Sequence, residues 1–475
     1  MTAAIHSLID GLGDIPVITK PQLIRQKSRD HYWYSPILRE RLEHVAADLV
    51  VCPRDEADVV AALAACYVKG VPVTARGAGT GNFGQSMPVR GGVVLDMTAL
   101  DRVLEIAPGR VRVQAGAIMS DLDRACRTVS RQELRIHPSS WTSASIGGFV
   151  AGGSMGVGSV AYGLLRDPGN VLSARIVTME ATPRVLLLEG EDVQKVNHAY
   201  GTNGIITEVE MPLAPARDWE ECVVAFPDLG EALRFAQGLA ERVDLPKKLL
   251  SVIGAPVPER YLPGFDGLLA DGPHVVLIMA AADAMAGIEA CVRAAGRRFA
   301  YRLGAFERRP KPILRLYEYA WNHTVLQALK QDSSITYLQT LFPPPNHLDL
   351  IERTTARFGD EMAMHVEFIW FNGAPAALGL QLLHYTTPER VQAIIDELEA
   401  EGCPVFNPHA ETLEEGGMKQ IDREQLAFKR EADPDGLLNP GKMLGWDDPG
   451  YDGKPRAFYL YPKRQPAALE ADPPA

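Results

Sequence analysis

A glycine-rich loop is the part of this sequence whose residue types most clearly point to chemistry. Glycines stand at positions 77, 79, 81 and 84 within the stretch Pro72–Ser86. Glycine lets the backbone turn through positive φ and approach a ligand closely. Successive main-chain N–H groups in such a turn form a concave anion site. The loop is therefore predicted to hold a phosphate or pyrophosphate, and the question is which cofactor carries it.

A nicotinamide dinucleotide is the first candidate, because Gly79–Gly84 matches the GxGxxG pattern and Asp96 follows at the end of an apolar run. That fingerprint needs a crossover helix between the glycines and the acidic residue. Only Gln85–Gly92 stands between them here, and its Met-Pro step disfavours a helix. Parallel pairing across so short a connection is also disfavoured. The spacing argues against a nicotinamide Rossmann domain.

The helix that positions the loop is expected before it instead. Ala57–Lys69 carries apolar residues at helical spacing, with Asp55 as a fitting N-cap and Gly70 as a stop. The order is therefore strand, helix, strand, glycine loop. The elements expected after the loop are a strand over 92–95, a hairpin over 103–114 and a helix over 120–129.

The stretch from about Leu49 to Pro212 resembles the FAD-binding domain of the vanillyl-alcohol oxidase / p-cresol methylhydroxylase (PCMH) family. It is most similar to the branch of glycolate oxidase and D-lactate dehydrogenase. Five motifs in the family's order carry the resemblance, which extends over nearly the whole chain. They stand here as Arg76–Thr80 with Gly84, Gln85 and Pro88; Pro138 with Ser145–Gly148 and Ala151–Gly156; Tyr162, Gly163, Asp167 and Val171; Gly201–Thr207; and Asp433–Lys442. Asp167 and Val171 stand further apart than in the family pattern.

The resemblance implies FAD as the cofactor and assigns its contacts to these motifs. The implied FAD contacts are Arg76, Gly77, Ala78, Gly79, Thr80, Gly81, Asn82, Gln85, Ser86, Pro138, Ser145, Gly147, Gly148, Gly152, Ser154, Ile206 and Asn439. Some members of the family bond the flavin to a histidine of the first loop or a cysteine of the second. Thr80 and Asn82 stand in the first loop here, and Ala151–Ser159 contains no cysteine, so non-covalent FAD is expected. His137, just before the second motif, keeps a covalent bond open.

Oxidation of a C–H bond beside a hydroxyl needs a hydride acceptor, which is the implied flavin, and a base for the hydroxyl proton. Two histidine–glutamate pairs are candidates. Met364–Phe371 predicts a strand, so His365 and Glu367 point to one face. His409 and Glu411 share a face if their segment is extended, and His409 falls where the hydroxy-acid branch has the histidine of its Glu-His-Gly element. Each histidine could instead be a purely structural residue, hydrogen-bonded in the core or at the surface.

A metal site of the hydroxy-acid branch is not expected. That branch often builds one from a His-x(6)-His strand and the glutamate of Glu-His-Gly. Asn372 stands seven residues after His365 here, and Pro408 precedes His409. An amide and a proline do not replace imidazole and carboxylate as zinc ligands. The choice between an aliphatic hydroxy acid and a phenolic alcohol as substrate is left open.

A second patch, over 308–323, mixes cations with aromatic residues. Arg315, Tyr317, Tyr319, Trp321 and His323 would suit an aromatic or carboxylated substrate through stacking and bidentate pairing. Aromatic residues of a helix edge that pack on the flavin domain explain the same pattern. Both readings remain open from the sequence.

The expected fold class is α+β, with five regions. A lead-in (1–45) packs on a two-subdomain PCMH-type FAD-binding domain (46–215); an α+β substrate or cap domain (216–403) follows, then a segment that returns to the flavin domain (404–445), and a tail (446–475) that is disordered after Pro462. Two functions fit. One is an FAD-dependent oxidase or dehydrogenase that acts on an alcohol or hydroxy acid. The other is a flavin-holding electron-transfer subunit of a larger complex, which would not need so large a cap.

Composition narrows the partners. The net charge is −12, from 48 basic and 60 acidic residues, and an acidic chain repels the phosphate backbone of a nucleic acid. No run of about twenty apolar residues predicts a membrane span, and the N-terminus carries no signal-peptide pattern. Six scattered cysteines without a Cys-x-x-Cys pair indicate reduced thiols, a cytoplasmic location and no self-contained iron–sulfur cluster. The electron acceptor and the oligomeric state, a homodimer included, are left open.

Overall fold

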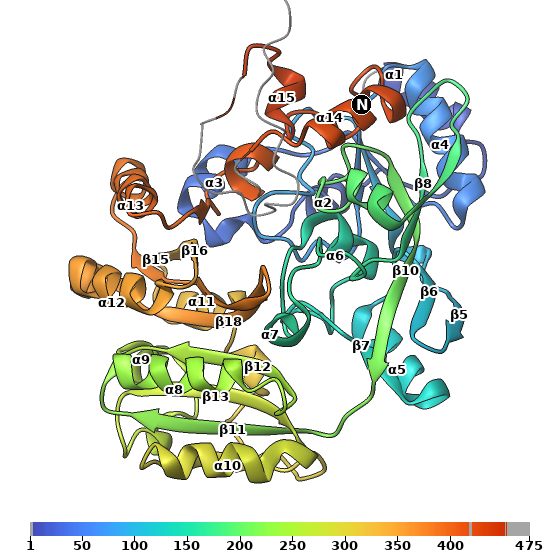
Figure 1. The fold of residues 1–475 in the computed structure, drawn as a ribbon. Coiled ribbons are helices and arrows are strands. Elements are labelled where there is room, and N and C mark those ends of the chain that lie inside the picture. The colour runs from blue at the N-terminus through green and yellow to red at the C-terminus, as the bar shows by residue number, and fades with distance from the viewer. Residues whose placement is uncertain (1–2, 418–419, 452, 454–475) are drawn as a thin grey trace, which may run out of the picture.

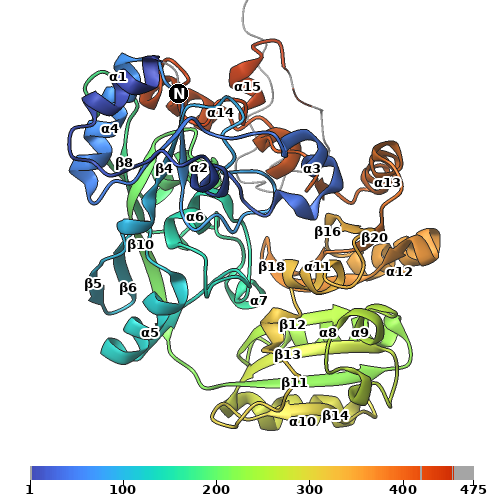
Figure 2. The same ribbon diagram turned by 180° about the vertical axis from the view of Figure 1, so that it is seen from behind.

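A computed structural model describes residues 3–417, 420–451 and 453. The fold is α+β: two subdomains form one end of the molecule, and a larger sheet with its helices forms the cap. In both views the C-terminal helix α14 (Arg423–Ala432) lies at the same end of the molecule as the N-terminal helix α1 (Ala3–Gly11), and the cap lies at the other end (Figures 1 and 2).

The first subdomain is a four-stranded sheet that delivers the chain into the glycine loop. Its strand order is β1-β2-β4-β3, and β2, β4 and β3 run parallel. Helix α4 (Glu56–Val68) connects β2 to β3, and the side chain of Asp55 caps it by accepting from the Asp58 N–H. The predicted helix and its N-cap are thereby confirmed. The strands are β1 (Val17–Ile18), β2 (Leu49–Val51), β3 (Val73–Arg76) and β4 (Val93–Asp96).

The second subdomain is a six-stranded sheet whose backbone order is β5-β6-β10-β8-β9, with β7 also paired to β10. The predicted hairpin is confirmed as β5 and β6, and the predicted helix as α5 (Met119–Ser130). A Cβ on Gly147 would lie 2.5 Å from the Cβ of Ala115, so glycine lets helix α6 press against the strand end. The other elements are β5 (Val103–Ala107), β6 (Arg110–Gln114), β7 (Gln132–Leu134), β8 (Ser173–Val177), β9 (Val185–Glu189), β10 (Ile205–Pro215), α6 (Ile146–Gly152) and α7 (Ser159–Tyr162).

The cap is an eight-stranded antiparallel sheet in the order β14-β11-β13-β12-β18-β19-β16-β21, beside a three-stranded sheet, β15-β20-β17. Its strands are β11 (Trp219–Phe226), β12 (Lys247–Ile253), β13 (His274–Ala281), β14 (Phe299–Leu303), β15 (Ile335–Tyr337), β16 (Gln339–Phe342), β17 (Met362–Ala363), β18 (His365–Phe371), β19 (Ala374–Gly379), β20 (Leu382–His384) and β21 (Val405–Phe406). The predicted strands over 274–279 and 364–371 are confirmed as β13 and β18.

Both faces of the cap sheet are buried, because side chains alternate between two cores. Along β13, Val275 and Leu277 enter one core, and Val276 and Ile278 enter the other. Helices α8, α10, α12 and α13 supply residues to the second core, whereas α9 and α11 supply the first. These helices are α8 (Leu229–Glu241), α9 (Val257–Tyr261), α10 (Met285–Ala294), α11 (Asn322–Leu329), α12 (His347–Phe358) and α13 (Pro388–Ala400).

The C-terminal segment returns from the cap to the first subdomain. Strand β21 still pairs with β16, so the cap sheet extends to Phe406, past the predicted boundary at 403. The chain then pairs alongside β3: the N–H of Val73 donates to the carbonyl of Leu437 at 2.8 Å, and the N–H of Asn439 donates to the carbonyl of Val73 at 2.8 Å. Helix α15 (Leu444–Asp447) follows, and the tail expected to be disordered after Pro462 lies outside the described residues.

The N-terminal lead-in packs on the glycine loop, with helices α2 (Pro21–Lys27) and α3 (Pro36–Leu42) on either side of a short aromatic turn. The N–H of His31 in this turn donates to the carbonyl of Gly81 at 2.7 Å. Each of the six cysteines is a free thiol. In the part of the chain that the structure describes, no helix is long and apolar enough to cross a membrane.

Candidate cofactor and substrate cavity

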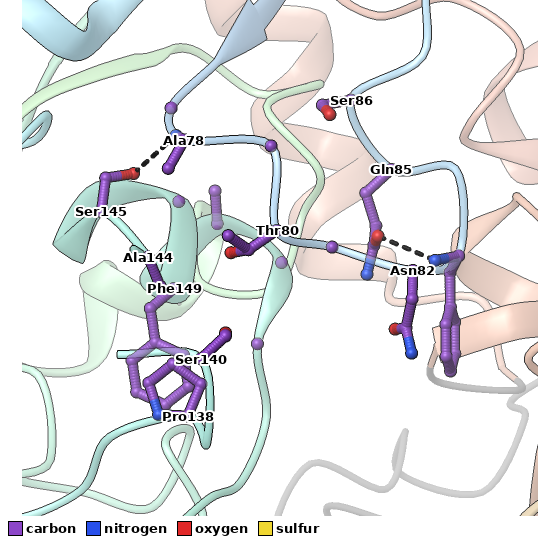
Figure 3. A pocket seen from close by; sticks show the side chains of 18 of the residues that line it. Ala78, Thr80, Asn82, Gln85, Ser86, Pro138, Ser140, Ala144, Ser145 and Phe149 are labelled. Carbon is purple, nitrogen blue, oxygen red and sulfur yellow. Dashed lines mark hydrogen bonds between the residues drawn. The ribbon is translucent and has the colours of Figure 1, made fainter. Parts of the chain in front are cut away.

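A cavity of about 430 Å³ lies between the glycine loop, the second glycine-rich motif and the cap. This volume falls in the range of small-molecule and cofactor sites. Figure 3 shows one side of it: the loop from Ala78 to Ser86 lies beside the segment that carries Ser140, Ser145 and Phe149, and the Ala78 N–H donates to the Ser145 hydroxyl at 3.4 Å. Residues of both subdomains, of the lead-in and of the cap line the cavity.

The glycine loop presents its main chain to the cavity. Its own side chains fold back onto it: the carbonyl oxygen of the Gln85 side chain accepts from the Phe83 N–H at 3.0 Å (Figure 3). Gly79 has φ +70°, and a Cβ there would lie 1.8 Å from the Arg76 guanidinium. A Cβ on Gly81 would lie 2.3 Å from the Gln85 side chain. The positive φ favours glycine at position 79, and at both positions a neighbouring side chain would have to move to admit a Cβ.

Most of the residues predicted to contact FAD line this cavity. Those on its wall are Gly77, Ala78, Gly79, Thr80, Gly81, Asn82, Gln85, Ser86, Pro138, Ser145, Gly147, Gly148, Gly152, Ser154 and Ile206. We name this surface, together with His198 and Tyr200, the loop wall. The motifs are far apart in sequence, and the fold brings them together.

Arg76 and Asn439 lie behind the loop wall rather than on it. The side-chain amide of Asn439 donates to the carbonyls of Gln85 at 2.8 Å and Tyr200 at 2.7 Å, and so joins two segments of the wall. The Arg76 guanidinium lies beneath Gly79, where burial lowers its pKa and the nearby Asp96 and Asp30 act against that shift. Both residues shape the loop from below.

The opposite surface, which we name the cap wall, was mostly missed by reasoning from the sequence, which named only its Trp321 and His323 as substrate candidates. It consists of Trp321, Asn322, His323, Leu326, Gln339, Leu378 and Phe406 from the cap, with His31 and Tyr34 from the lead-in. The only signal was the aromatic patch over 308–323, whose last three residues reach the cavity at the start of α11. Trp321 has φ +54°, a strained conformation for a bulky residue.

The pair His365 and Glu367 lies behind the cap wall and holds it. Both side chains are fully buried on β18, on one face as predicted, and neither lines the cavity. Three donors meet at one carboxyl oxygen of Glu367: the Trp321 N–H at 2.7 Å, His365 Nε2 at 2.9 Å and the Ser251 hydroxyl at 3.0 Å. The bond to Trp321 makes the pair a support for the strained turn, one residue layer from the cavity.

His409 and Glu411 do not form the extended pair that was expected, because Pro408 and His409 lie in a turn. Both ring nitrogens of His409 are occupied: Nε2 donates to the Tyr337 carbonyl at 3.1 Å, and Nδ1 accepts from the Ser35 hydroxyl at 2.7 Å. Burial lowers the pKa of His409 to about 4. Glu411 pairs with Arg41 at 2.6 Å. Neither side chain lines the cavity, so the geometry does not support a role as base.

The other three residues suggested for substrate binding lie away from the cavity. The Tyr319 hydroxyl donates to the Pro263 carbonyl at 2.6 Å inside the cap core. Tyr317 is buried against the stacked rings of His137 and Trp141. Arg315 is largely exposed and lies 3.9 Å from Glu221. Of these three residues, only Tyr317 packs against the second subdomain, as the packing reading predicted.

The described part of the cavity wall carries no Asp, Glu, Lys or Arg. Its three histidines, His31, His198 and His323, all have a lowered pKa, with burial as the largest cause. For His198 the value falls to about 4. The wall is therefore uncharged near neutral pH. Among the residues that the structure describes, no three His, Cys, Asp or Glu side chains gather as metal ligands.

A family model described as an FAD binding domain matches residues 47–186, the span that holds both glycine motifs. These residues are an FAD-binding domain. The glycolate oxidase subunit GlcD of Escherichia coli K12 is 33% identical over 200 residues, which cover 40% of this chain and 39% of that protein. A D-lactate dehydrogenase of Archaeoglobus fulgidus is 29% identical over 214 residues, or 42% of this chain and 46% of that protein. The resemblance to this family and branch is confirmed.

These relatives are matched over less than half of their own length, so the similarity concerns the flavin domain and not the whole protein. An FAD-linked oxidoreductase of Mycobacterium tuberculosis is 31% identical over 206 residues, which cover 40% of this chain and 43% of that protein. Among solved structures, an alkyldihydroxyacetonephosphate synthase superposes with a TM-score of 0.71, covering 93% of this chain and 86% of that one at 15% identity. At that identity the likeness shows the shared fold, cap included.

Proposed function

We propose that this protein is an FAD-dependent oxidoreductase that oxidises the CH–OH group of a small molecule. One observation carries the proposal. The cavity has a main-chain wall from an FAD-binding domain and a side-chain wall from the cap, so a bound cofactor and a small molecule would meet inside it. Bound FAD would supply the hydride acceptor, and the protein supplies binding and orientation.

The loop wall fits FAD in its chemistry. Its glycines expose main-chain N–H groups to a pyrophosphate, and no Asp or Glu of the described wall would repel it. His198 offers a further contact: its Nδ1 donates to the Gly153 carbonyl at 2.9 Å, which leaves a lone pair on Nε2. Nε2 is buried and has no hydrogen-bond partner among the described residues, and buried polar atoms are nearly always hydrogen-bonded. A hydroxyl or amino group of the cofactor is a donor of the kind this atom needs.

We infer that the FAD is held without a covalent bond. The described wall of the cavity contains no cysteine, and Thr80 and Asn82 occupy the first loop. His137 lies outside the wall with its ring stacked on Trp141 at 4.2 Å, which removes the reason to suspect it. The histidines to examine are His31, His198 and His323, which line the cavity.

The alternative, a flavin-holding electron-transfer subunit with no substrate site, is less well supported. Such a subunit needs no side-chain wall opposite its cofactor, whereas the cap places Trp321, Asn322 and His323 there. The relatives named glycolate oxidase and D-lactate dehydrogenase support a hydroxy acid or a simpler alcohol as the substrate class. The free thiols support a cytoplasmic location.

The experiment uses the purified full chain under anaerobic conditions. We expect a yellow protein that releases FAD into the supernatant on acid precipitation and whose oxidised-flavin absorption bleaches with a primary or secondary alcohol. Flavin fluorescence retained by the precipitated chain would contradict the non-covalent proposal. A yellow protein that no alcohol or hydroxy acid bleaches, but that a reduced protein partner does, would favour the electron-transfer subunit.

A further inference from the structure

A buried ion pair joins the cap to the second subdomain. Lys248 of β12 and Glu133 of β7 meet with 3.1 Å between Nζ and Oε1, and their side chains are 5% and 3% exposed. Lys248 Nζ also donates to the Leu134 carbonyl at 3.2 Å. Burying two charges is costly unless their geometry is good and their remaining polar atoms are also hydrogen-bonded. The other partners of this pair meet that condition.

The Glu133 carboxylate accepts from donors on both sides of the contact. On the cap side, the indole N–H of Trp219 in β11 lies 3.1 Å from each carboxylate oxygen. The N–H of Arg217, in the linker between β10 and β11, donates at 3.3 Å. On the other side, the Arg127 guanidinium of α5 pairs with the same carboxylate. We name Glu133, Lys248, Trp219 and Arg127 the joint. Hydrogen bonds are directional, so one placement of the cap satisfies all of these donors.

A β-bulge explains how a lysine of the cap sheet reaches this carboxylate. Lys247 and Leu249 pair with the consecutive residues Ala280 and Met279 of β13, so Lys248 is the extra residue on β12. A bulge leaves one residue outside the ladder and re-aims its side chain. The local irregularity of β12 therefore belongs to the contact with the second subdomain.

Lys248 also holds the two segments that flank the second glycine-rich motif. Its carbonyl accepts from the Gly158 N–H at 2.7 Å, and its Nζ reaches the Leu134 carbonyl. The segment after Leu134 enters the cavity wall at Pro138, and the segment before Gly158 leaves that wall at Gly156. Helix α7, which follows Gly158, lies beside β12 in both views (Figures 1 and 2). One residue of the cap is thus bonded to both ends of this part of the loop wall.

The same strand supports the cap wall. Ser251, also on β12, donates to the Glu367 carboxylate at 3.0 Å, and that carboxylate accepts from the Trp321 N–H at 2.7 Å. Strand β12 therefore connects to the loop wall through Lys248 and to the cap wall through Ser251. Because every one of these contacts is a hydrogen bond, the strand fixes the placement of one wall relative to the other.

We propose that Glu133 and Lys248 are positioning residues, which hold the cap in the orientation that places a substrate on the cap wall against the flavin on the loop wall. This inference rests on the proposed function and adds residues that act on it from outside the cavity. Stability alone does not explain the pair, because well-packed apolar residues often stabilise a buried contact as well as an ion pair does. Orientation does explain it, since a misplacement of about 1 Å can slow a reaction on the order of a hundredfold.

Lys248→Met tests the pair without leaving a buried charge alone, because Glu133 keeps Arg127 and Trp219. The FAD-loaded full chain is mixed anaerobically with an alcohol or hydroxy acid that reduces the wild type. We expect the limiting rate of flavin reduction at saturating substrate to fall about tenfold or more, while the FAD dissociation constant changes less than about threefold. Lys248→Arg keeps the charge and the donors and should restore most of the rate.

Two further variants complete the series. Trp219→Phe removes one donor of the joint and keeps the ring and both charges, so it is measured in case Lys248→Met does not fold. Its limiting rate should fall about threefold. Glu361→Gln is the matched control, because Glu361 pairs with Arg390 at 2.6 Å inside the cap. It should lower stability without changing the limiting rate.

Trypsin provides a measurement that needs no substrate. The main chain of Arg217 is held by Glu133, so a cap that loosens should open the linker more often. Proteolysis of a transiently opened segment follows the population of the open form. We expect cleavage after Arg217, identified by the mass of the fragment that begins at Asp218, to be about fivefold faster or more in Lys248→Met. Lys248→Arg and Glu361→Gln should match the wild type.

The outcomes separate this inference from the proposed function. An unchanged limiting rate in folded, FAD-loaded Lys248→Met would overturn the inference, whatever the cleavage rate, and would leave the proposed function standing. Equal losses of FAD affinity and rate would also overturn it, because the pair would then support only the loop wall. If Lys248→Met does not fold, unchanged reduction and cleavage in Trp219→Phe would overturn it. If no alcohol or hydroxy acid reduces the wild-type flavin, the proposed function fails, and the cleavage rates decide whether the joint holds the cap.

Discussion

The loop wall and the cap wall of the cavity differ in what they present to a ligand. The loop wall offers main-chain groups, because glycines occupy the positions where a Cβ would collide, as at Gly79 and Gly81. The cap wall offers side chains, and Trp321 Nε1 and His323 Nδ1 have no hydrogen-bond partner among the described residues. The loop wall therefore presents mostly main chain to a ligand, whereas the cap wall presents side chains.

The comparison shows that one uncharged cavity offers different groups to a ligand on its two walls. Main-chain N–H groups held in a turn can bind a pyrophosphate without any lysine or arginine. The cap wall has an indole, two imidazoles, a phenol and two amides, and no charged side chain among its described residues. Substitutions on the two walls should therefore separate loss of cofactor from loss of substrate.

The largest expected effect is on the loop wall. Gly79→Asp should give a folded protein that binds FAD at least a hundredfold more weakly, because the new side chain meets Arg76 at a φ of +70° and adds a negative charge facing the pyrophosphate. The measurement is the flavin absorbance per chain after gel filtration. Gly109→Asp is the matched control: its φ is +79°, and no atom lies within 4 Å of its Cβ position. Stoichiometric FAD in Gly79→Asp would show that the loop does not hold the pyrophosphate.

Glu367→Ala tests the buried support of the cap wall, because it removes the carboxylate that accepts from the Trp321 N–H. Removal of the acceptor should release the Trp321 turn, so we expect alcohol affinity to fall more than tenfold while FAD binding changes less than threefold. Flavin titration and anaerobic reduction measure the two quantities separately. Glu289→Ala, at a surface ion pair with Arg293, is the control. Equal losses of FAD and substrate would mean that the two walls are not independent.

His198→Leu tests the orphaned acceptor of the loop wall. It should weaken FAD binding about tenfold, the scale of one buried hydrogen bond, and leave the preference among substrates unchanged. The dissociation constant comes from quenching of free flavin fluorescence. Tighter FAD binding in the variant would show that His198 Nε2 faces no donor on the cofactor.

The smallest functional effect is expected at His409. Flavin reduction in His409→Asn should stay within threefold of the wild type, because both ring nitrogens are already bonded inside the protein. A reductive half-reaction slowed a hundredfold would restore His409 as the base and contradict our assignment.

The same variant should change the acid sensitivity of the fold. The pKa of His409 is lowered from 6.5 to about 4, so its contribution to stability is present above pH 6.5 and is lost as the pH falls towards 4. The loss is at most about 3 kcal/mol. Urea unfolding between pH 7.5 and 4.5 should therefore show a shallower decline in His409→Asn than in the wild type. His384→Asn, on an exposed histidine, is the control and should follow the wild type.

The elements around the flavin were predictable because their signals are local. Helix α4 has its cap at Asp55 and apolar residues at helical spacing, and the hairpin of β5 and β6 turns at Pro108 and Gly109. The His365–Glu367 pair was placed on one face correctly by the period of two, yet the strand alone did not show which way that face points. It points into a buried network with Ser251 and Trp321.

The sequence by itself determined the loop wall. Where the backbone must adopt positive φ or admit a close neighbour, glycine is favoured, and the glycines can be read directly from the sequence. Only the tertiary structure decided the cap wall. His31, Trp321 and Gln339 carry no mutual spacing, and they meet because the lead-in, α11 and β16 pack around one cavity. The turn at Pro408 likewise directs His409 towards Ser35. Side-chain sites assembled from distant segments depend on packing, and packing is a property of the whole fold.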